Sequence, residues 1–317
     1  MDAENLVTGG CGFIGSNLVR MLVEEGRTVR ILDNLATGNP ANVQDLIRRG
    51  GVELVHGDVR DLDAVRAACQ GVQHVFHFAA LPSVIGSVEA PGLSNAVNLD
   101  GTVNLLMAAR DAKARRFVFS SSSAIYGDSP ELPKRENMLP APLSPYGVQK
   151  LSGEYYCRIF RDLYGLPAFV LRYFNVFGPR QNPRSQYAAV IPLFIEAVRD
   201  GHAPVIYGDG KQTRDFVFVE DVARANLCCR QAPESAAGGI YNIACGTSIS
   251  VNQLAETVAR VMGRPDLRAR HEPARAGDVR DSVADASRAR SILEWKPKTS
   301  FEDGLKRTVD WFTHVSG

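Results

Sequence analysis

Short apolar runs alternate along the first half of the chain with stretches whose apolar residues have helical spacing. The runs lie at residues 6–7, 28–32, 53–56, 75–78, 116–119 and 168–172, and helical patterns lie at 17–25, 62–68, 94–110 and 145–164. A strand and a helix in regular alternation predict a parallel, doubly wound sheet with helices on both faces. We therefore expect an α/β fold whose ligands bind beyond the carboxyl ends of the strands.

The alternation loosens after residue 172, where loops become rich in Pro, Gly and Asn. A smaller substrate-binding domain is therefore expected to follow the sheet domain. The segments 216–219 and 240–243 again have the pattern of strands. The predicted organisation is a sheet domain over 1–175, a C-terminal substrate-binding domain over 176–317, and a return of about 214–244 to the first sheet.

A glycine-rich turn separates the first apolar run from the first helical pattern. It contains Gly9, Gly12 and Gly15, with Phe13 and Ile14 between the last two. Gly9 permits a tight turn, Gly12 lets the backbone approach a pyrophosphate, and Gly15 allows close packing of helix on strand. The N-terminus of the helix then points at the anion. The order of these features predicts a dinucleotide site in a sheet of the Rossmann type.

Asp33 directly follows the second apolar run. At this strand end an acidic side chain accepts hydrogen bonds from an adenosine ribose. A glycine turn alone can occur without a ligand, but strand, turn, helix, strand and acid in this order predict nucleotide binding. A carboxylate at this place repels a 2′-phosphate, so NAD is expected rather than NADP.

Tyr146 and Lys150 are four residues apart in a predicted helix that begins after Ser144 and Pro145. This spacing puts both side chains on one helix face. An ammonium group beside a phenol favours the phenolate, and the positive ring of an oxidised nicotinamide adds to the effect. Tyr146 could then take a proton from a substrate hydroxyl while a hydride leaves the same carbon. The serines of 120–123, at the end of an apolar run, are the expected neighbours of this pair.

With these motifs the chain resembles the extended short-chain dehydrogenase/reductase family, and within it the NAD-dependent nucleoside-diphosphate-sugar 4-epimerases. The resemblance runs from residue 6 to about 312 and covers 8–15, 33–35, 57–59, 77–80, 98, 101–102, 120–127, 144–150, 171–179, 208–216 and 275–278. It implies NAD as cofactor, Asp58 and Val59 at the adenine, and Asn98 behind the cofactor. The implied cofactor set is Gly9, Gly12, Phe13, Ile14, Gly15, Asp33, Asn34, Asp58, Val59, Ala79, Ala80, Asn98, Tyr146 and Lys150.

The resemblance also implies a UDP-sugar as substrate. Ser122 would hydrogen-bond the reacting hydroxyl beside Tyr146, while Lys150 would hold the nicotinamide ribose. Arg214 and Arg275 would bind the diphosphate, as Arg forks do, although Arg214 could instead form a surface ion pair with Asp215. The implied substrate set is Ser83, Ser122, Ser123, Tyr146, Asn175 (diphosphate), Tyr187 and Val190 (uracil), Tyr207, Arg214, Arg275, Asp278 (uridine ribose) and Ser282.

Three classes of activity compete on these residues. A 4-epimerase would oxidise C4, turn the 4-keto sugar over and reduce its other face. A dehydratase or decarboxylase typically has an acidic residue soon after the catalytic Ser, but Ser122 is followed by Ser123 and Ala124. A nucleotide-binding regulator would not need Tyr146 and Lys150 together.

Ser282 is expected to decide the sugar. By the resemblance it stands where a bulky tyrosine closes the pocket of enzymes restricted to glucose and galactose. Serine leaves room for an N-acetyl group, which favours UDP-GlcNAc and UDP-GalNAc, with UDP-Glc and UDP-Gal as further substrates. UDP-glucuronate is the alternative, since Arg184 could meet a carboxylate.

The net charge of +1 gives no general attraction to nucleic acid or to an anionic membrane. The six cysteines are scattered without CxxC spacing, and the histidines have no metal-ligand spacing. We therefore expect a cytoplasmic protein without metal, nucleic-acid or membrane partners. The resemblance further implies a homodimer through the helices predicted at 94–110 and 145–164.

Overall fold

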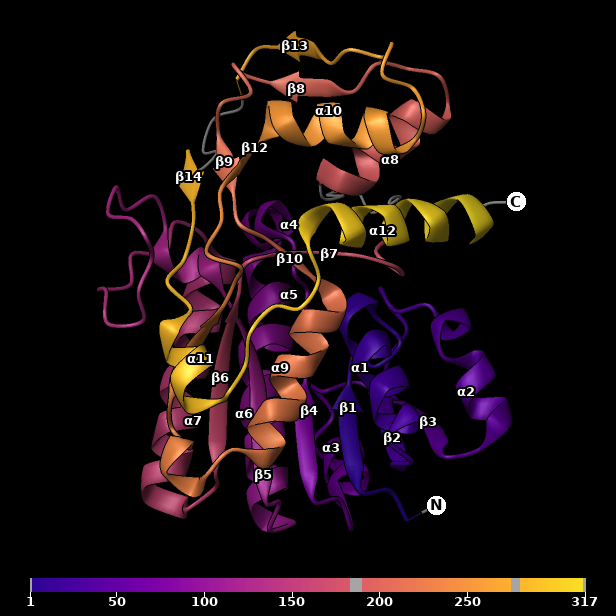
Figure 1. The fold of residues 1–317 in the computed structure, drawn as a ribbon. Coiled ribbons are helices and arrows are strands. Elements are labelled where there is room, and N and C mark those ends of the chain that lie inside the picture. Colours follow the sequence, from indigo (N-terminus) through magenta and orange to yellow (C-terminus); the bar gives the residue numbers. More distant parts are fainter. Residues whose placement is uncertain (1, 183–189, 275–279, 316–317) are drawn as a thin grey trace.

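The computed structural model describes residues 2–182, 190–274 and 280–315. Its centre is a seven-stranded sheet in which all neighbouring strands are parallel, in the order β11-β6-β5-β4-β1-β2-β3 (Figure 1). The strands are β1 (Asn5–Thr8), β2 (Val29–Asp33), β3 (Val52–His56), β4 (His74–His77), β5 (Arg116–Ser122), β6 (Ala168–Tyr173) and β11 (Ile240–Ile243). The predicted α/β fold with a doubly wound Rossmann-type sheet is confirmed.

Helices cover both faces of this sheet because successive strand residues point to opposite sides. Phe117 and Phe119 of β5 pack with α3 (Leu62–Cys69), α6 (Gly101–Asp111) and α7 (Pro145–Tyr164). Val118, between them, belongs to the core on the other face, under α1 (Phe13–Glu24) and α9 (Val219–Gln231). The short helices α2 (Gln44–Arg49) and α11 (Ser287–Ile292) pack on the edge strands β3 and β11, whereas α4 (Val84–Glu89) and α5 (Pro91–Asn95) pack on α7.

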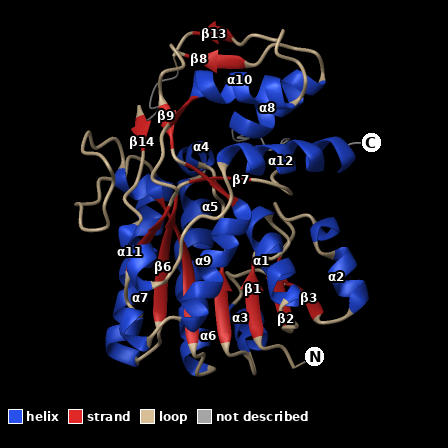
Figure 2. Ribbon diagram, in the orientation of Figure 1, coloured by secondary structure: helices blue, strands red, loops and turns tan. Residues whose placement is uncertain are grey.

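A smaller lobe lies beyond the carboxyl ends of the strands (Figure 2). Its helices α8 (Val190–Arg199), α10 (Val251–Val261) and α12 (Phe301–Val315) share a separate core with Phe216 and Phe218. Its short strands are β7 (Asn175–Phe177), β8 (Val205–Tyr207), β9 (Thr213–Arg214), β10 (Phe216–Phe218), β12 (Ile249–Ser250), β13 (Arg270–Glu272) and β14 (Asp281–Ser282). The lobe therefore faces the edge of the sheet where ligands of such folds bind.

Three predicted elements differ from the structure. Helix α1 begins at Phe13, four residues earlier than expected, because the chain enters the helix directly after Gly12. The helix predicted at 94–110 is interrupted by a π-helical segment, Ala96–Asp100, between α5 and α6. Of the two strands expected to return to the sheet, β11 pairs with β6, but β10 pairs with β7 in a separate sheet.

Among the described residues, no helix is both long and apolar enough to cross a lipid bilayer.

Candidate active site

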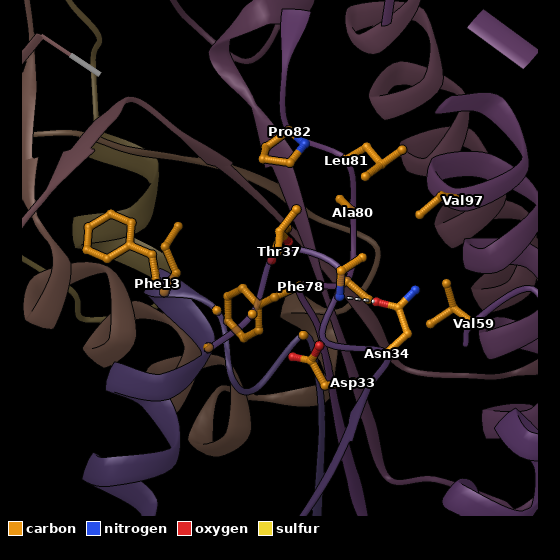
Figure 3. Close-up of a pocket in the computed structure, with 18 of the residues that line it drawn as sticks. Phe13, Asp33, Asn34, Thr37, Val59, Phe78, Ala80, Leu81, Pro82 and Val97 are labelled. Atoms are coloured by element: carbon orange, nitrogen blue, oxygen red, sulfur yellow. Dashed lines mark hydrogen bonds between the residues drawn. The ribbon is translucent and has the colours of Figure 1, made fainter. Parts of the chain in front are cut away.

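A cavity of about 250 Å³ lies at the carboxyl ends of β1, β2, β4 and β5 (Figure 3). Twelve of the fourteen residues predicted to hold a cofactor line it: Gly9, Gly12, Phe13, Ile14, Gly15, Asp33, Asn34, Val59, Ala79, Ala80, Tyr146 and Lys150. The position agrees with the rule that open parallel sheets bind ligands beyond their carboxyl ends.

The glycine turn at one side of the cavity cannot carry side chains at two positions. Gly9 has φ +67°, and a Cβ there would lie 2.8 Å from the backbone nitrogen of Ala79. A Cβ on Gly15 would lie 2.3 Å from the carbonyl oxygen of Gly9. Gly15 therefore permits close packing of α1 on the turn itself, rather than on the strand. The turn leaves the N-terminus of α1 facing the cavity, as a pyrophosphate requires.

Asp33 ends β2 beside this turn and is 7 % exposed. Its Oδ2 accepts a hydrogen bond from the backbone N–H of Cys11 at 2.9 Å, and its Oδ1 accepts one from Leu35 at 2.9 Å. Each carboxylate oxygen can accept a further bond, so that Asp33 fits the hydroxyls of a ribose. Burial and the charge of Asp33 raise the pKa of the Cys11 thiol to about 12, which keeps the thiol neutral.

Asp58 and Asn98, also predicted at the cofactor, do not line the cavity. Asp58 accepts hydrogen bonds from Arg60 and from Asn34 Nδ2, so that it orients a lining residue. Asn98 is 1 % exposed; its Oδ1 accepts from the backbone N–H of Leu81 at 2.7 Å, and its Nδ2 donates to Gln149 Oε1 at 2.8 Å. It thus fixes a lining segment against α7 from behind.

Tyr146 and Lys150 stand on the face of α7 that borders the cavity. The hydroxyl of Ser144 caps this helix by accepting from Gly147 N, and Pro145 suits its first turn. Lys150 Nζ donates to the carbonyl oxygen of Ser120 at 2.8 Å and lies 5.8 Å from the centre of the Tyr146 ring. The helix therefore places an ammonium group directly below a phenol.

Ser122, at the end of β5, completes this group. Its hydroxyl interacts with the phenol, and this hydrogen bond favours the phenolate, whereas burial raises the pKa of Tyr146 above its usual value. Burial lowers the pKa of Lys150 to about 8. His77 lies beneath, between the hydroxyls of Thr8 and Thr102 at 2.8 and 2.9 Å, and burial lowers its pKa to about 3. Tyr146 is the group here that can exchange a proton with a substrate.

The other predicted substrate residues lie in two places. Ser83 caps α4 and Ser123 follows Ser122 in a short turn. Arg214 and Ser282 face each other across the parallel pair β9–β14, and Asn175 Nδ2 donates to the carbonyl of Asp215 at 3.4 Å. Val190 starts α8 and Tyr207 ends β8. Tyr187, Arg275 and Asp278, together with Arg184, fall outside the described residues.

Asp215 does not serve the surface ion pair considered for Arg214. It is fully buried, and its carboxylate accepts hydrogen bonds from the backbone N–H groups of Cys245, Gly246 and Ala284 at 2.8, 2.9 and 3.2 Å. Burial raises the pKa of Asp215 to about 6. It therefore joins β9 to the segments that follow β11 and β14, and so supports the neighbours Arg214 and Ser282.

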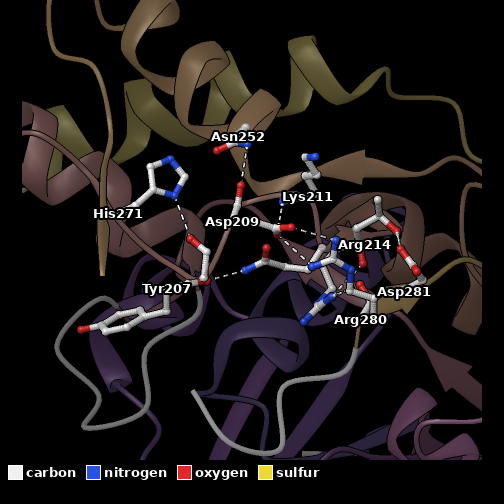
Figure 4. A network of polar contacts seen from close by, with 11 residues as sticks. Tyr207, Asp209, Lys211, Arg214, Asn252, His271, Arg280 and Asp281 are labelled. Carbon is white, nitrogen blue, oxygen red and sulfur yellow. Dashed lines mark hydrogen bonds and ion pairs between the residues drawn. The ribbon is translucent and has the colours of Figure 1, made fainter. Parts of the chain in front are cut away.

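A polar network continues from β9 into the outer part of the lobe (Figure 4). Arg280 forms an ion pair with Asp209 at 2.8 Å, and Thr213 Oγ1 donates to Asp281 Oδ1 at 2.6 Å. His271 Nδ1 lies 2.8 Å from the carbonyl oxygen of Gly208. These contacts tie β8, β9, β13 and β14 together around Arg214.

Ser120 and Ser121, of the serine run expected beside Tyr146 and Lys150, also line the cavity. Several further lining residues were not predicted: Leu32, Ala36, Thr37, Gly38, Gly57, Phe78, Leu81, Pro82, Val97 and Tyr173. The clearest of them are Thr37 and Gly38, in the loop after Asp33. A Cβ on Gly38 would lie 2.9 Å from Asp33 Oδ2. The sequence signal that could have indicated this loop is Gly38, which stands five residues after Asp33. No group of His, Cys, Asp or Glu that could hold a metal occurs in the described parts of the chain.

Comparisons with known proteins agree with this geometry. Residues 5–244 match the model of the "NAD dependent epimerase/dehydratase family". A putative UDP-glucose 4-epimerase of Methanocaldococcus jannaschii is 41 % identical over 96 % of this chain and 97 % of its own length. A UDP-glucuronate 4-epimerase of Thermodesulfobacterium geofontis is 34 % identical over 96 % and 95 % of the two chains.

Among solved structures, the UDP-N-acetylglucosamine 4-epimerase of Methanobrevibacter ruminantium M1, in complex with UDP-N-acetylmuramic acid, superposes with a TM-score of 0.94. It is 40 % identical, and the match covers 99 % of each chain. The glycine turn, Asp33 and the Tyr146–Lys150 pair occupy one cavity of this shared fold. The chain therefore belongs to the NAD-dependent epimerase/dehydratase family, and its cofactor is NAD.

Proposed function

We propose that this protein is a UDP-hexose 4-epimerase that interconverts UDP-GlcNAc and UDP-GalNAc and also accepts UDP-Glc and UDP-Gal. The observation that carries this proposal is the Tyr146–Lys150 pair, which lines the same cavity as the glycine turn and Asp33, together with the hydrogen bond between Ser122 and the Tyr146 phenol. One phenol that is both hydrogen-bonded to a serine and placed above an ammonium suits proton transfer to and from a sugar hydroxyl.

The fit of NAD to this cavity rests on the turn that a Cβ would fill at Gly9 and Gly15. When bound, NAD supplies a hydride acceptor and donor and a positively charged ring. Tyr146 takes the proton of the C4 hydroxyl, while Ser122 orients that hydroxyl by hydrogen bonding. Lys150 stabilises the phenolate electrostatically, which offsets the pKa increase that burial imposes on Tyr146.

The outcome at C4 depends on how the 4-keto sugar is held. Arg214 and Asn175 lie in the lobe above the cavity, where they would bind the diphosphate rather than the sugar ring. A sugar anchored through its diphosphate can present either face to the same phenol. Tyr146 then returns the proton to the oxygen from which it was taken, and the hydride that the bound cofactor would return to the opposite face of C4 inverts the configuration.

The preference for acetylated sugars rests on Ser282, next to Arg214 in the lobe. A small side chain here leaves the space that an N-acetyl group needs.

UDP-glucuronate is the second candidate, since one relative is named for that activity. Dehydration or decarboxylation is less well supported, because Ser123 and Ala124 follow Ser122 without an acid. A regulator without catalysis would not require the buried Tyr146–Lys150 arrangement.

Mass spectrometry of the nucleotides released by heat from purified protein tests the cofactor and the substrate together. NAD or NADH is expected, because Asp33 disfavours a 2′-phosphate. Incubation with UDP-GlcNAc, UDP-Glc and UDP-glucuronate should then convert the first fastest. Release of NADP, or fastest conversion of UDP-glucuronate, would contradict the assignment of Asp33 or of the substrate, respectively.

We further infer that the protein acts as a homodimer in the cytoplasm. Apolar side chains remain exposed along one side of α7 and on the adjoining α4 and α5: Val148, Tyr155, Tyr156, Ile159, Leu163, Tyr164, Val84, Ile85, Val88 and Leu93. A second copy of the same surface would cover this patch, as isologous interfaces do. All six cysteines are free thiols, which fits a reducing compartment.

A further inference from the structure

A buried ion pair lies one helical turn beyond Lys150. Glu154 of α7 and Arg172 of β6 each expose 2 % of their side chains. Arg172 Nε donates to Glu154 Oε1 at 2.9 Å, and Arg172 Nη2 donates to Oε2 at 2.6 Å. Ser121 Oγ also donates to Glu154 Oε1. The carboxylate thus ties α7 to β5 at the residue between Ser120, which accepts from Lys150, and Ser122.

The other side of Arg172 is also engaged. Its Nη1 donates to Tyr126 Oη at 2.8 Å, and that hydroxyl donates to Asn242 Oδ1 at 2.7 Å. The backbone N–H of Asn242 donates to Glu136 Oε1 at 2.8 Å. Hydrogen bonds therefore run from α7 across β6 to β11 at the edge of the sheet, and they fix where Glu154 can lie.

Stability alone gives a weak account of such a pair. Two charges lose their hydration on burial, and apolar residues of similar volume often replace a buried pair without loss of stability. Removal of one partner is different, because it leaves an uncompensated charge in the interior. We therefore ask how the Glu154–Arg172 pair affects the position and protonation of the neighbouring residues on α7.

We propose that the Glu154–Arg172 pair is a positioning device for Tyr146, which holds α7 against the serine end of β5 and keeps the charge below Lys150 balanced. The inference rests on the proposed role of Tyr146 in epimerisation. It adds two residues that touch neither cofactor nor sugar to the machinery of the site.

Helix geometry sets the size of the effect. Tyr146, Lys150 and Glu154 follow one another at four-residue intervals on one face. Eight residues at about 1.5 Å each separate Tyr146 and Glu154 by roughly 12 Å along the axis. At an effective dielectric constant of about 20, one unbalanced charge at this distance changes a protonation equilibrium about tenfold. Arg172 cancels that effect as long as the pair is intact.

Other ionisable groups around α7 do not replace this balance. Those that face Lys150, Glu154 or Arg172 are Tyr146 and Cys157 of α7, His77 of β4, Tyr173 of β6, Tyr126 of the turn after β5, and Glu136, whose pKa burial raises. Burial keeps the thiol of Cys157 and the imidazole of His77 neutral, since it raises the pKa of Cys157 and lowers that of His77. Glu89 of α4 and Asp100 of the π-helical segment, on elements packed against α7, are exposed to solvent.

The test is a titration of Tyr146 in NAD-loaded protein. Tyrosinate absorbance is followed against pH, and the same curve of Tyr146→Phe is subtracted. Arg172→Met leaves the negative charge of Glu154 unbalanced, so the midpoint should rise by about one pH unit. Glu154→Gln leaves the positive charge of Arg172 unbalanced, so the midpoint should fall by a similar amount. The double variant should return to the wild-type midpoint.

Arg172→Lys is the matched control, since it retains the charge and should keep the midpoint close to that of wild type. If the pair had a purely structural role, the midpoints of the two single variants would both stay at the wild-type value or would both shift in the same direction. Either result would overturn the proposal. If Arg172→Met does not fold, the fall expected in Glu154→Gln decides alone. The measurement needs no turnover. Failure of the wild type to epimerise any UDP-sugar would therefore refute the proposed function separately.

Discussion

At the scale of single residues, Tyr146 is the group on which turnover depends. Tyr146→Phe removes the phenol that exchanges the proton but keeps the ring that lines the cavity. The rate constant kcat should fall about a hundredfold or more, which corresponds to about 2.7 kcal/mol of transition-state stabilisation. Steady-state kinetics measure the fall in kcat, and calorimetry with UDP measures binding, which should stay close to that of wild type. Unchanged kcat in a variant that still contains NAD would refute the assignment.

Ser282 carries the prediction on substrate choice. Ser282→Tyr would project a ring into the space assigned to the N-acetyl group, and close-packed sites tolerate such overlap poorly. Turnover of UDP-GlcNAc and UDP-GalNAc should fall at least tenfold, about 1.4 kcal/mol, while UDP-Glc and UDP-Gal are largely spared. The ratio of kcat/KM for the two pairs, in wild type and variant, is the readout. A ratio that stays constant would mean that Ser282 does not contact the sugar.

At the scale of elements, the glycine turn and α1 have to fit each other before any cofactor can bind. Gly15→Ala introduces a Cβ that would lie 2.3 Å from the carbonyl oxygen of Gly9 and 2.9 Å from Gly10 Cα. Since both contacts are with backbone, the turn must move, and purified protein should contain little NAD. Absorbance and mass spectrometry of the released nucleotide quantify the loss.

Gly92→Ala in α5 is the control for this change. Among the described residues, no atom outside its own helix and its chain neighbours lies within 4 Å of a Cβ at Gly92, and alanine is the better helix former by about 1 kcal/mol. This variant should keep its NAD and unfold at the same or a higher temperature. Full NAD occupancy in Gly15→Ala would show that the turn can yield where the structure leaves it no space.

Elements that repeat a local pattern could be predicted from the sequence, whereas long-range contacts could not. The turn at Gly9 and the acid at Asp33 each follow an apolar run, and parallel strands bring such ends to the same edge. Asn98 lies in a π-helical segment, and its side chain hydrogen-bonds Leu81 and Gln149, which lie far away along the chain. The local sequence pattern around residue 98 does not predict those partners.

The same limit applied to charged residues. In the sequence, Glu154 looks like an acid on the solvated side of a helix. The fold buries it against Arg172 of β6, with which it forms an ion pair. Asp58, expected at the adenine, also accepts hydrogen bonds from Asn34 and Arg60, partners that the sequence did not indicate. Sequence spacing identified which residues gather near the cavity. It could not tell which of them line the cavity and which support the lining residues from behind.

At the scale of the whole molecule, the proposed dimer can be tested on the exposed side of α7. Leu163 is 71 % exposed and Ile159 is 42 % exposed. A carboxylate at either position would be desolvated in a dimer, and an unpaired buried charge is costly. Leu163→Glu and Ile159→Glu should therefore shift the protein towards 34.5 kDa in light scattering.

Leu193→Glu offers the comparison for these variants. Leu193 is 43 % exposed on α8, in the smaller lobe away from α7. This variant should keep the mass of the wild type, which we expect to be that of two chains. A wild-type protein of 34.5 kDa at working concentration would contradict the dimer.

The path of the chain between the two lobes has a consequence for engineering. After building β7 to β10 above the sheet, the chain returns through α9 to the edge strand β11, and it then leaves again for β12 and α10. A chimera with a single crossover near residue 175 would therefore exchange α9 and β11 along with the upper lobe, and β6 would pair with a foreign strand. The chain returns to the sheet once more as α11, which packs on β11, before α12 joins the upper lobe. Transfer of the whole upper lobe from a homologue therefore requires three inserts, one before α9, one between β11 and α11, and one after α11. The sheet domain would then keep its own residues, and the residues that set substrate preference would be exchanged as separate segments of the chain.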